Sequence, residues 1–133
     1  MNDLLSWLFA GHMVGDYIFQ TRWMAEKKTE LYTALFTHAA IYTCSIWVAS
    51  LLCALASGFA PAEMVSRGLS LPCVLFVFVT HSIIDKRGIT KWWCKNVTKS
   101  NRVWLIIMTD QALHIVVLGA ACLLERCMTG GLF

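Results

Sequence analysis

Four long apolar runs take up most of this chain and limit what it can fold into. They cover residues 4–20, 31–58, 69–85 and 103–124. Each run is close to or above the roughly 17–25 residues that a helix needs to cross a bilayer. Backbone N–H and C=O groups find no water partners in hydrocarbon, so runs of this length must be helical. The sequence therefore predicts an all-α fold, a four-transmembrane-helix bundle made of two helical hairpins.

The composition agrees with lipid as the solvent. Of the 133 residues, 58% are hydrophobic and 14% are charged, whereas a soluble domain carries about 25% charged residues. The runs and their short joins leave no room for a soluble domain, so we expect one membrane domain over residues 1–133. Asp3 stands where a secretory signal would carry a basic residue, and we expect the first run to remain in the mature protein. The six cysteines show no C-x-x-C spacing and are expected to be packing residues.

The basic residues of the joins predict the orientation of the spans. Only Arg67 and Arg126 lie on one side, while nine lysines and arginines lie in the first and third joins. These nine are Arg22, Lys27, Lys28, Lys86, Arg87, Lys91, Lys95, Lys99 and Arg102. Positive joins are retained in the cytoplasm, so we expect both termini outside and these two joins inside. The net charge of +3 reflects this orientation, and we expect no nucleic-acid partner.

The third join, residues 86–102, has the spacing of an amphipathic helix. At helical spacing its apolar and basic residues separate onto two faces, Ile89, Trp93 and Val97 against Lys91, Lys95 and Arg102. We expect a short interfacial helix on the inner leaflet, with its lysines against anionic lipid. The alternative is a basic loop that only fixes the topology.

Each apolar run contains one histidine. The four are His12, His38, His81 and His114. An ionisable group in hydrocarbon costs about 2.5 kcal/mol or more, so such groups normally face the bundle interior and take part in a function. This distribution indicates a polar site shared by all four spans.

Three of these histidines have an aspartate one helical turn away. The pairs are His12 with Asp16, His81 with Asp85, and Asp110 with His114. Residues four apart project from the same face of a helix. Gln20 extends the first polar stripe by one more turn, and Gln111 stands beside Asp110.

The depth of these side chains predicts where they meet. Counted from the inner ends of the spans, they lie about four to eleven residues in, at ~1.5 Å per residue. We therefore expect the cluster in the cytoplasmic half of the bundle. Gly11 and Gly15 form a small-x-x-x-small step that lets another helix approach the polar stripe. The alternative reading of the two glycines is helix packing alone.

At these positions the chain resembles a bacterial integral-membrane family, domain-of-unknown-function family 3307. The resemblance covers nearly the whole chain and rests on residues 12–20, 23–25 with Lys28, His38, the His81 and Asp85 pair, and 110–114. It implies the membrane fold, a place in the bacterial inner membrane and shared polar positions, but no activity. A distant likeness to membrane-bound metal-dependent hydrolases, which also carry intramembrane histidines and aspartates, is an analogy of fold alone.

Imidazole together with carboxylate is a ligand set for Zn²⁺, Mn²⁺ or Fe²⁺. We therefore predict a divalent metal ion held by His12, Asp16, His81, Asp85, Asp110 and His114. One ion would neutralise the deep carboxylates of Asp16 and Asp110, whereas Asp85 is expected to reach the interface beside Lys86 and Arg87. His38 is the predicted acid or base, with Gln20 and Gln111 beside it, in a hydrolase acting on a lipid or another membrane-accessible substrate.

Three other readings of the cluster remain open. The same groups suit a carrier or channel for a proton, ion or small solute, which would need a homo-oligomer because four helices enclose only a narrow conduit. Histidine pairs on facing helices suit haem b. Interhelical hydrogen bonds that only specify packing are the structural reading.

Overall fold

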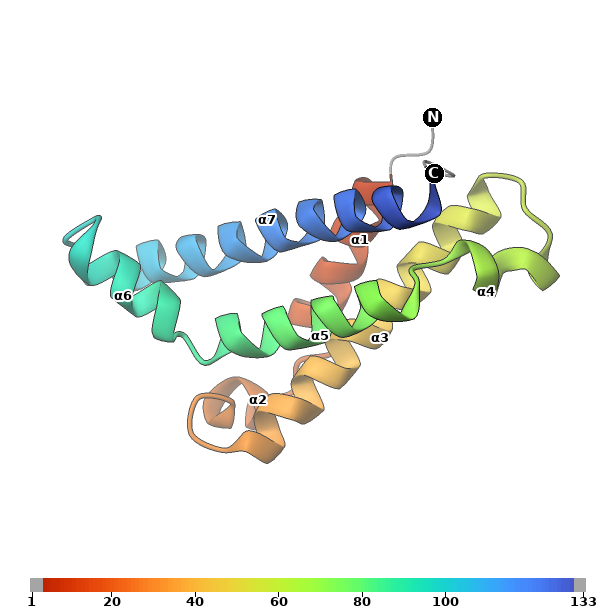
Figure 1. Ribbon diagram of the computed structural model, residues 1–133. Helices are drawn as coiled ribbons and strands as arrows, with labels where there is room; N and C mark the ends of the chain where they lie inside the picture. Colours follow the sequence, from red (N-terminus) through yellow and green to blue (C-terminus); the bar gives the residue numbers. More distant parts are fainter. Residues whose placement is uncertain (1–3, 131–133) are drawn as a thin grey trace.

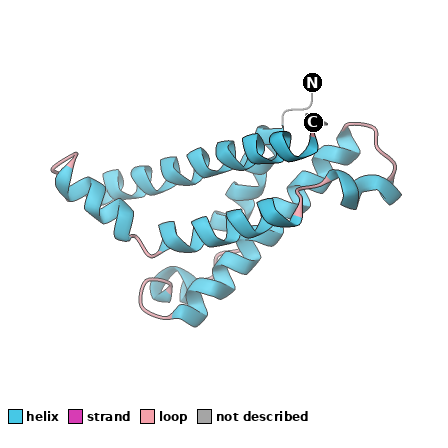
Figure 2. Ribbon diagram, in the orientation of Figure 1, coloured by secondary structure: helices cyan, strands magenta, loops and turns pink. Residues whose placement is uncertain are grey.

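Four helices formed from the predicted apolar runs make up the core of the computed structural model, which describes residues 4–130 (Figure 1). They are α1 Leu4–Met13, α3 Tyr32–Ala56, α5 Leu71–Asp85 and α7 Val103–Thr129. Three shorter α-helices lie in the joins: α2 Arg22–Lys27, α4 Met64–Arg67 and α6 Gly88–Asn96. Over the described residues the chain contains helices, turns and loops only, as Figure 2 shows, so the all-α prediction is confirmed.

The helices differ in whether they can cross a bilayer. α3 and α7, with 25 and 27 residues, are long and apolar enough. α5 has 15 residues, or about 22 Å at 1.5 Å per residue, and becomes a third candidate only together with the helical segment Pro61–Arg67, from which it is bent by 59°. α1 has 10 residues and is continued by a short π-helix. Two or three candidate spans are thus present, and the predicted four-span bundle is not confirmed.

A π-helix, η1 Val14–Ile18, interrupts the first predicted span. Its wider turn is closed by the Phe19 N–H, which donates to the Val14 carbonyl over 3.0 Å. The prediction of one helix over residues 4–20 is therefore corrected: α1 ends at Met13 and the helical segment ends at Ile18. The turn buries Gly15 and Asp16 and leaves Tyr17 and Ile18 exposed. Such turns are frequent at functional sites.

Apolar and polar side chains are distributed as in a membrane protein. The outer faces of α3, α5 and α7 expose large apolar side chains such as Phe36, Val79 and Val116. At one end of the bundle, where α1 begins and α7 ends, the interior is mostly an apolar cluster that includes Leu8, Ile46, Val77 and Leu118, with the Glu125 carboxylate buried near the end of α7. At the other end the interior is polar. The polar end is the one that carries the first and third joins, as the depth of the histidines predicted.

The prediction of a helix in the third join is confirmed by α6. Its buried side chains, Thr90 and Cys94, face α7, where the Cys94 Sγ lies 3.7 Å from the Thr109 Oγ1. Its predicted apolar face remains uncovered, because Ile89 and Trp93 are 46% and 44% exposed. α6 therefore keeps an exposed apolar face, and its position on the inner leaflet stays a prediction.

Candidate metal centre

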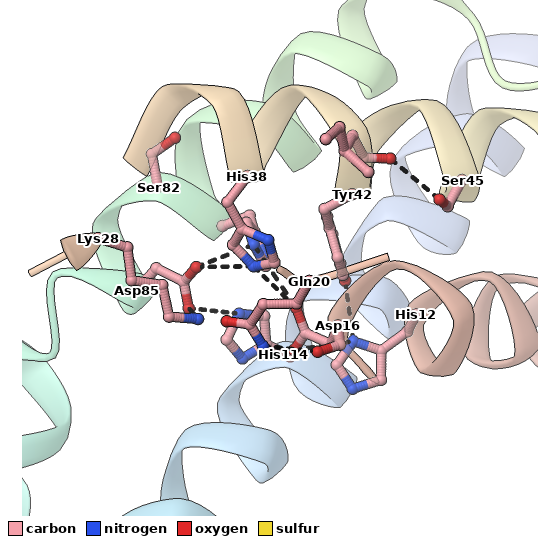
Figure 3. A network of polar contacts seen from close by, with 12 residues as sticks. His12, Asp16, Gln20, Lys28, His38, Tyr42, Ser45, Ser82, Asp85 and His114 are labelled. Atoms are coloured by element: carbon pink, nitrogen blue, oxygen red, sulfur yellow. Dashed lines mark hydrogen bonds and ion pairs between the residues drawn. The ribbon is translucent and has the colours of Figure 1, made fainter. Parts of the chain in front are cut away.

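Two histidines and two aspartates each bring one atom to a common point. Asp16 comes from the π-helix, His38 from α3, and His81 and Asp85 from α5 (Figure 3 labels His38, Asp16 and Asp85). The His38 Nε2 lies 3.2 Å from the Asp16 Oδ1 and 3.1 Å from the Asp85 Oδ2. The His81 Nε2 lies 3.8 and 3.2 Å from the same two oxygens. A tetrahedral ion with bonds of about 2.0–2.1 Å separates its ligand atoms by about 3.4 Å, which lies within the range of these four distances.

His114 supplies a fifth atom at the edge of this group. Its Nδ1 lies 2.8 Å from the backbone carbonyl oxygen of Asp110. A carbonyl oxygen only accepts, so Nδ1 carries a proton, and in the neutral ring Nε2 presents its lone pair. That Nε2 lies 3.9 Å from the Asp85 Oδ1. A lone pair facing a carboxylate oxygen is repulsive unless a cation or a proton lies between them.

The atoms that face the common point are buried and lack ordinary partners. The side chains of Asp16, His38, His81, Asp85 and His114 are each at most 4% exposed. Within residues 4–130, the His81 Nε2, the Asp85 Oδ2 and the His114 Nε2 make no hydrogen bond of good geometry. Buried polar atoms are nearly always hydrogen-bonded, so unsatisfied ones that converge require an explanation. A divalent ion bonded to them would supply it. Two sets of three groups are close enough to hold an ion, Asp16 with His38 and His81, and His81 with Asp85 and His114.

Lys28 is a member of the site that was not among the predicted site residues. Its Nζ donates to the Asp85 Oδ1 over 2.9 Å, and its side chain is only 5% exposed. The expectation that Asp85 reaches the interface beside Lys86 and Arg87 is therefore wrong: Asp85 is fully buried and paired with Lys28. A sequence signal could have indicated this pair. A lysine just before one apolar run and an aspartate at the end of another run lie on the same side of the predicted bundle.

A chain of hydrogen bonds lies beside the five groups and ends on Asp16. The His12 Nε2 donates to the Gln111 Oε1 over 2.9 Å, and the Tyr42 hydroxyl donates to the His12 Nδ1 over 3.2 Å. The Gln111 Nε2 donates to the Asp16 Oδ2 over 3.4 Å. Both nitrogens of His12 are thus used, and His12 supports the site from outside. The Tyr42 ring also lies flat on the His81 ring, with centroids 3.6 Å apart.

The remaining predicted residues take positions around the cluster. The Asp110 carboxylate accepts from the Thr90 hydroxyl over 3.0 Å and belongs to neither group of candidate ligands, and the same holds for His12. The Gln20 side chain donates to the backbone carbonyl of Asp16 over 2.7 Å. The structure thus unites Asp16, His81, Asp85 and His114 with His38, the predicted acid or base, and leaves His12 and Asp110 in supporting positions.

The charges of the site favour a bound cation. With neutral histidines, Asp16, Asp85 and Lys28 together carry one net negative charge in a desolvated interior, which is costly. A divalent ion changes this sum to one positive charge. A single anion bound to such an ion would make the centre neutral.

A helical bundle with an apolar exterior and a buried His/Asp cluster that could hold a metal ion defines a candidate membrane metalloprotein. The chain belongs to the family described as "Protein of unknown function (DUF3307)", whose family model matches residues 4–129. The predicted family resemblance is thereby confirmed. No curated protein and no solved structure matches the chain, so its chemistry has to be inferred from its own residues.

Proposed function

We propose that this protein is a membrane-embedded, metal-dependent hydrolase acting on a lipid or another membrane-accessible substrate. One divalent ion is held by Asp16, His38, His81 and Asp85. The observation that carries the proposal is the convergence of these buried atoms over distances of 3.1–3.8 Å. Two of them, the His81 Nε2 and the Asp85 Oδ2, lack hydrogen bonds, as does the neighbouring His114 Nε2. Mixed imidazole and carboxylate ligands suit Zn²⁺, Mn²⁺ or Fe²⁺.

The residues around the ion have distinct roles in hydrolysis. A divalent ion supplies an activated water as the nucleophile. His114, whose Nδ1 is fixed by the Asp110 carbonyl, presents its Nε2 at the edge of the shell and takes the water's proton as general base. His38, with its Nε2 between two carboxylates, is a ligand. Lys28 offsets the charge of Asp85.

Haem b fits this cluster poorly. The ring centroids of His38 and His81 lie 5.0 Å apart, and those of His81 and His114 lie 4.7 Å apart. A porphyrin inserted between two axial rings needs more room than this. The charge balance also supports hydrolysis. Asp16, Asp85 and Lys28 with a divalent ion carry one net positive charge, which a nucleophilic anion such as hydroxide neutralises.

The proposal predicts a metal content that depends on particular carboxylates. Purified protein in detergent should contain one transition-metal ion per chain by elemental analysis. Asp16→Asn and Asp85→Asn should each lower that content at least about tenfold, since each removes a charged ligand. Asp110→Asn and Glu125→Gln are matched controls, because both change buried carboxylates outside the ligand groups. Wild-type protein without bound transition metal, or equal loss in all four variants, would contradict the site.

Hydrolysis is tested on the same preparations. Metal-loaded protein should release products from a panel of labelled membrane lipids, and His114→Gln should lower turnover more than metal content. The matched variant His12→Gln should affect turnover less, because His12 lies outside the ligand groups.

Transport of the bound ion is a second candidate function. The observation in its favour is complete enclosure, since all five central groups are at most 4% exposed. Helices would then have to move to load and release the ion. Metal flux into proteoliposomes, lost in Asp16→Asn and accompanied by no product from any lipid, would replace the hydrolase with a carrier.

A further inference from the structure

The helix α6 and the loop after it carry positive charge that no nearby acid in the sequence balances. Between the buried Asp85 and Asp110 the chain contains six basic residues and neither aspartate nor glutamate. Four of the six are exposed and make no ion pair within residues 4–130: Lys91, Lys95, Lys99 and Arg102. Their charges are therefore available to a negatively charged partner.

The exposed basic residues of the first join differ in this respect. The Arg22 Nε donates to the Glu26 Oε1 over 2.6 Å, and the Lys27 Nζ donates to the Glu30 Oε2 over 2.9 Å. Each of these two positive charges has an acidic partner one helical turn away. The unbalanced charge is thus a property of α6 and its loop, and the first join provides a matched comparison.

Tertiary contacts hold α6 and its loop in place beside α7 (Figure 1). The Thr90 Oγ1 donates to the Asp110 Oδ1 over 3.0 Å. In the loop, the Ser100 N–H donates to the Cys94 carbonyl over 3.0 Å, which keeps Lys99 close to the end of α6. The exposed side chains of this segment are therefore presented from a fixed backbone.

The exposed side chains of α6 separate onto two faces. At 100° per residue, Ile89, Trp92 and Trp93 lie on one face and Lys91 and Lys95 on the other. All five are exposed. A helix with tryptophans on its apolar face and lysines on its polar face has the pattern of helices that lie in the membrane interface.

We propose that α6 and the loop after it bind anionic phospholipid at the bilayer surface. Trp92 and Trp93 lie at the boundary between headgroups and acyl chains, and the lysines face the headgroups. Charge complementarity identifies the occupant, because an anionic bilayer surface offers negative charge and apolar chains side by side. A second copy of this chain would instead bring the same positive charge to the contact. This surface is independent of the proposed hydrolase, since it includes no metal ligand.

The test uses the full chain in phosphatidylcholine bilayers with brominated lipid as a quencher of tryptophan fluorescence. The quenching that is lost when Trp92→Phe and Trp93→Phe are added is the signal from α6. Brominated phosphatidylglycerol should give this signal with at least about fivefold higher apparent affinity than brominated phosphatidylcholine, since one basic residue near an anionic surface contributes about that factor. The preference should decrease as salt is added.

Two double variants separate binding of anionic lipid from a general effect of charge. Lys91→Gln with Lys95→Gln should abolish the preference and leave quenching by brominated phosphatidylcholine unchanged. Arg22→Gln with Lys27→Gln is the matched control, because it removes two basic residues that have acidic partners, and it should keep the preference.

Three results would overturn the proposal. The first is equal quenching by the two brominated lipids in the wild type, and the second is an equal loss of preference in the two double variants. The third is an α6 signal that neither lipid quenches, which would place α6 away from the bilayer and make an acidic protein the better candidate for its partner. None of these results depends on the metal content, so the proposed hydrolase is tested separately.

Discussion

The adjacent residues Lys27 and Lys28 show how strongly position decides what a charge does. Lys27 pairs with Glu30 over 2.9 Å at the surface, where both side chains are about half exposed. Lys28 is buried against Asp85. A surface pair contributes little, whereas removing one member of a buried pair leaves an uncompensated charge. Both lysines contribute equally to a count of basic residues, so that count does not distinguish them.

Lys28→Met should destabilise the protein by about 3–5 kcal/mol, because Asp85 loses its buried partner. Lys27→Met, the adjacent control, should leave the melting temperature in detergent unchanged. Adding Asp85→Asn to Lys28→Met should recover part of the loss, since no unpaired carboxylate then remains. An equal effect of the two lysine substitutions would contradict the buried pair.

At the scale of the elements, the packing of α1 against α3 depends on Gly11. A Cβ at this position would lie 2.8 Å from the Ala49 Cβ and 2.9 Å from the Ser45 carbonyl oxygen. The second of these atoms is backbone and cannot rotate away. The small-x-x-x-small step of Gly11 and Gly15 lets α3 approach the polar stripe of α1 closely, as predicted: the Tyr42 Cα would lie 3.1 Å from a Cβ on Gly15.

Gly11→Ala should cost about 1–3 kcal/mol through overpacking and should also weaken metal binding, because α1 carries the π-helix with Asp16. Gly119→Ala is the control on α7, where a Cβ would meet nothing within 4 Å. Thermal melting and metal titration of both variants test this. A Gly11 variant as stable and as metal-replete as the Gly119 variant would refute the close approach.

The long helices could be predicted from hydropathy. The π-helix and the register between helices could not, because they depend on contacts between distant parts of the chain. Residues 31–58 and 103–124 correspond to α3 and α7 because a long apolar run has few alternatives to a helix. The π-helix has no comparable signal in the hydropathy pattern, and its Gly15 lies close to Tyr42, a contact that only the fold creates. The spacing of four residues placed Asp85 beside His81, but the register between helices decides that His38, and not His12, meets both carboxylates.

At the scale of the whole molecule, the number of crossings fixes the sides on which the ends lie. We propose four crossings, in which α1 with its π-helix and the short α5 span a locally thinned bilayer. Both ends would then be outside and the basic joins inside. With three crossings the two ends would lie on opposite sides.

Fusions report this directly. Alkaline phosphatase fused to either end should be active, and a fluorescent protein inserted after residue 98, in the loop that follows α6, should fold and fluoresce. Insertion after residue 59, between α3 and α4, is the opposite control and should be dark. Ends that report from opposite sides would replace four crossings with three.

The π-helix has a consequence for how such a site is gained or lost. It holds one residue more than an α-helical turn, and one residue corresponds to about 100° of rotation. Removing a single residue between positions 14 and 18 would restore a regular helix and swing Asp16 away from His38, with the chemical make-up of the span almost unchanged. Within this family, a one-codon change in length could separate members that bind an ion from members that only resemble them.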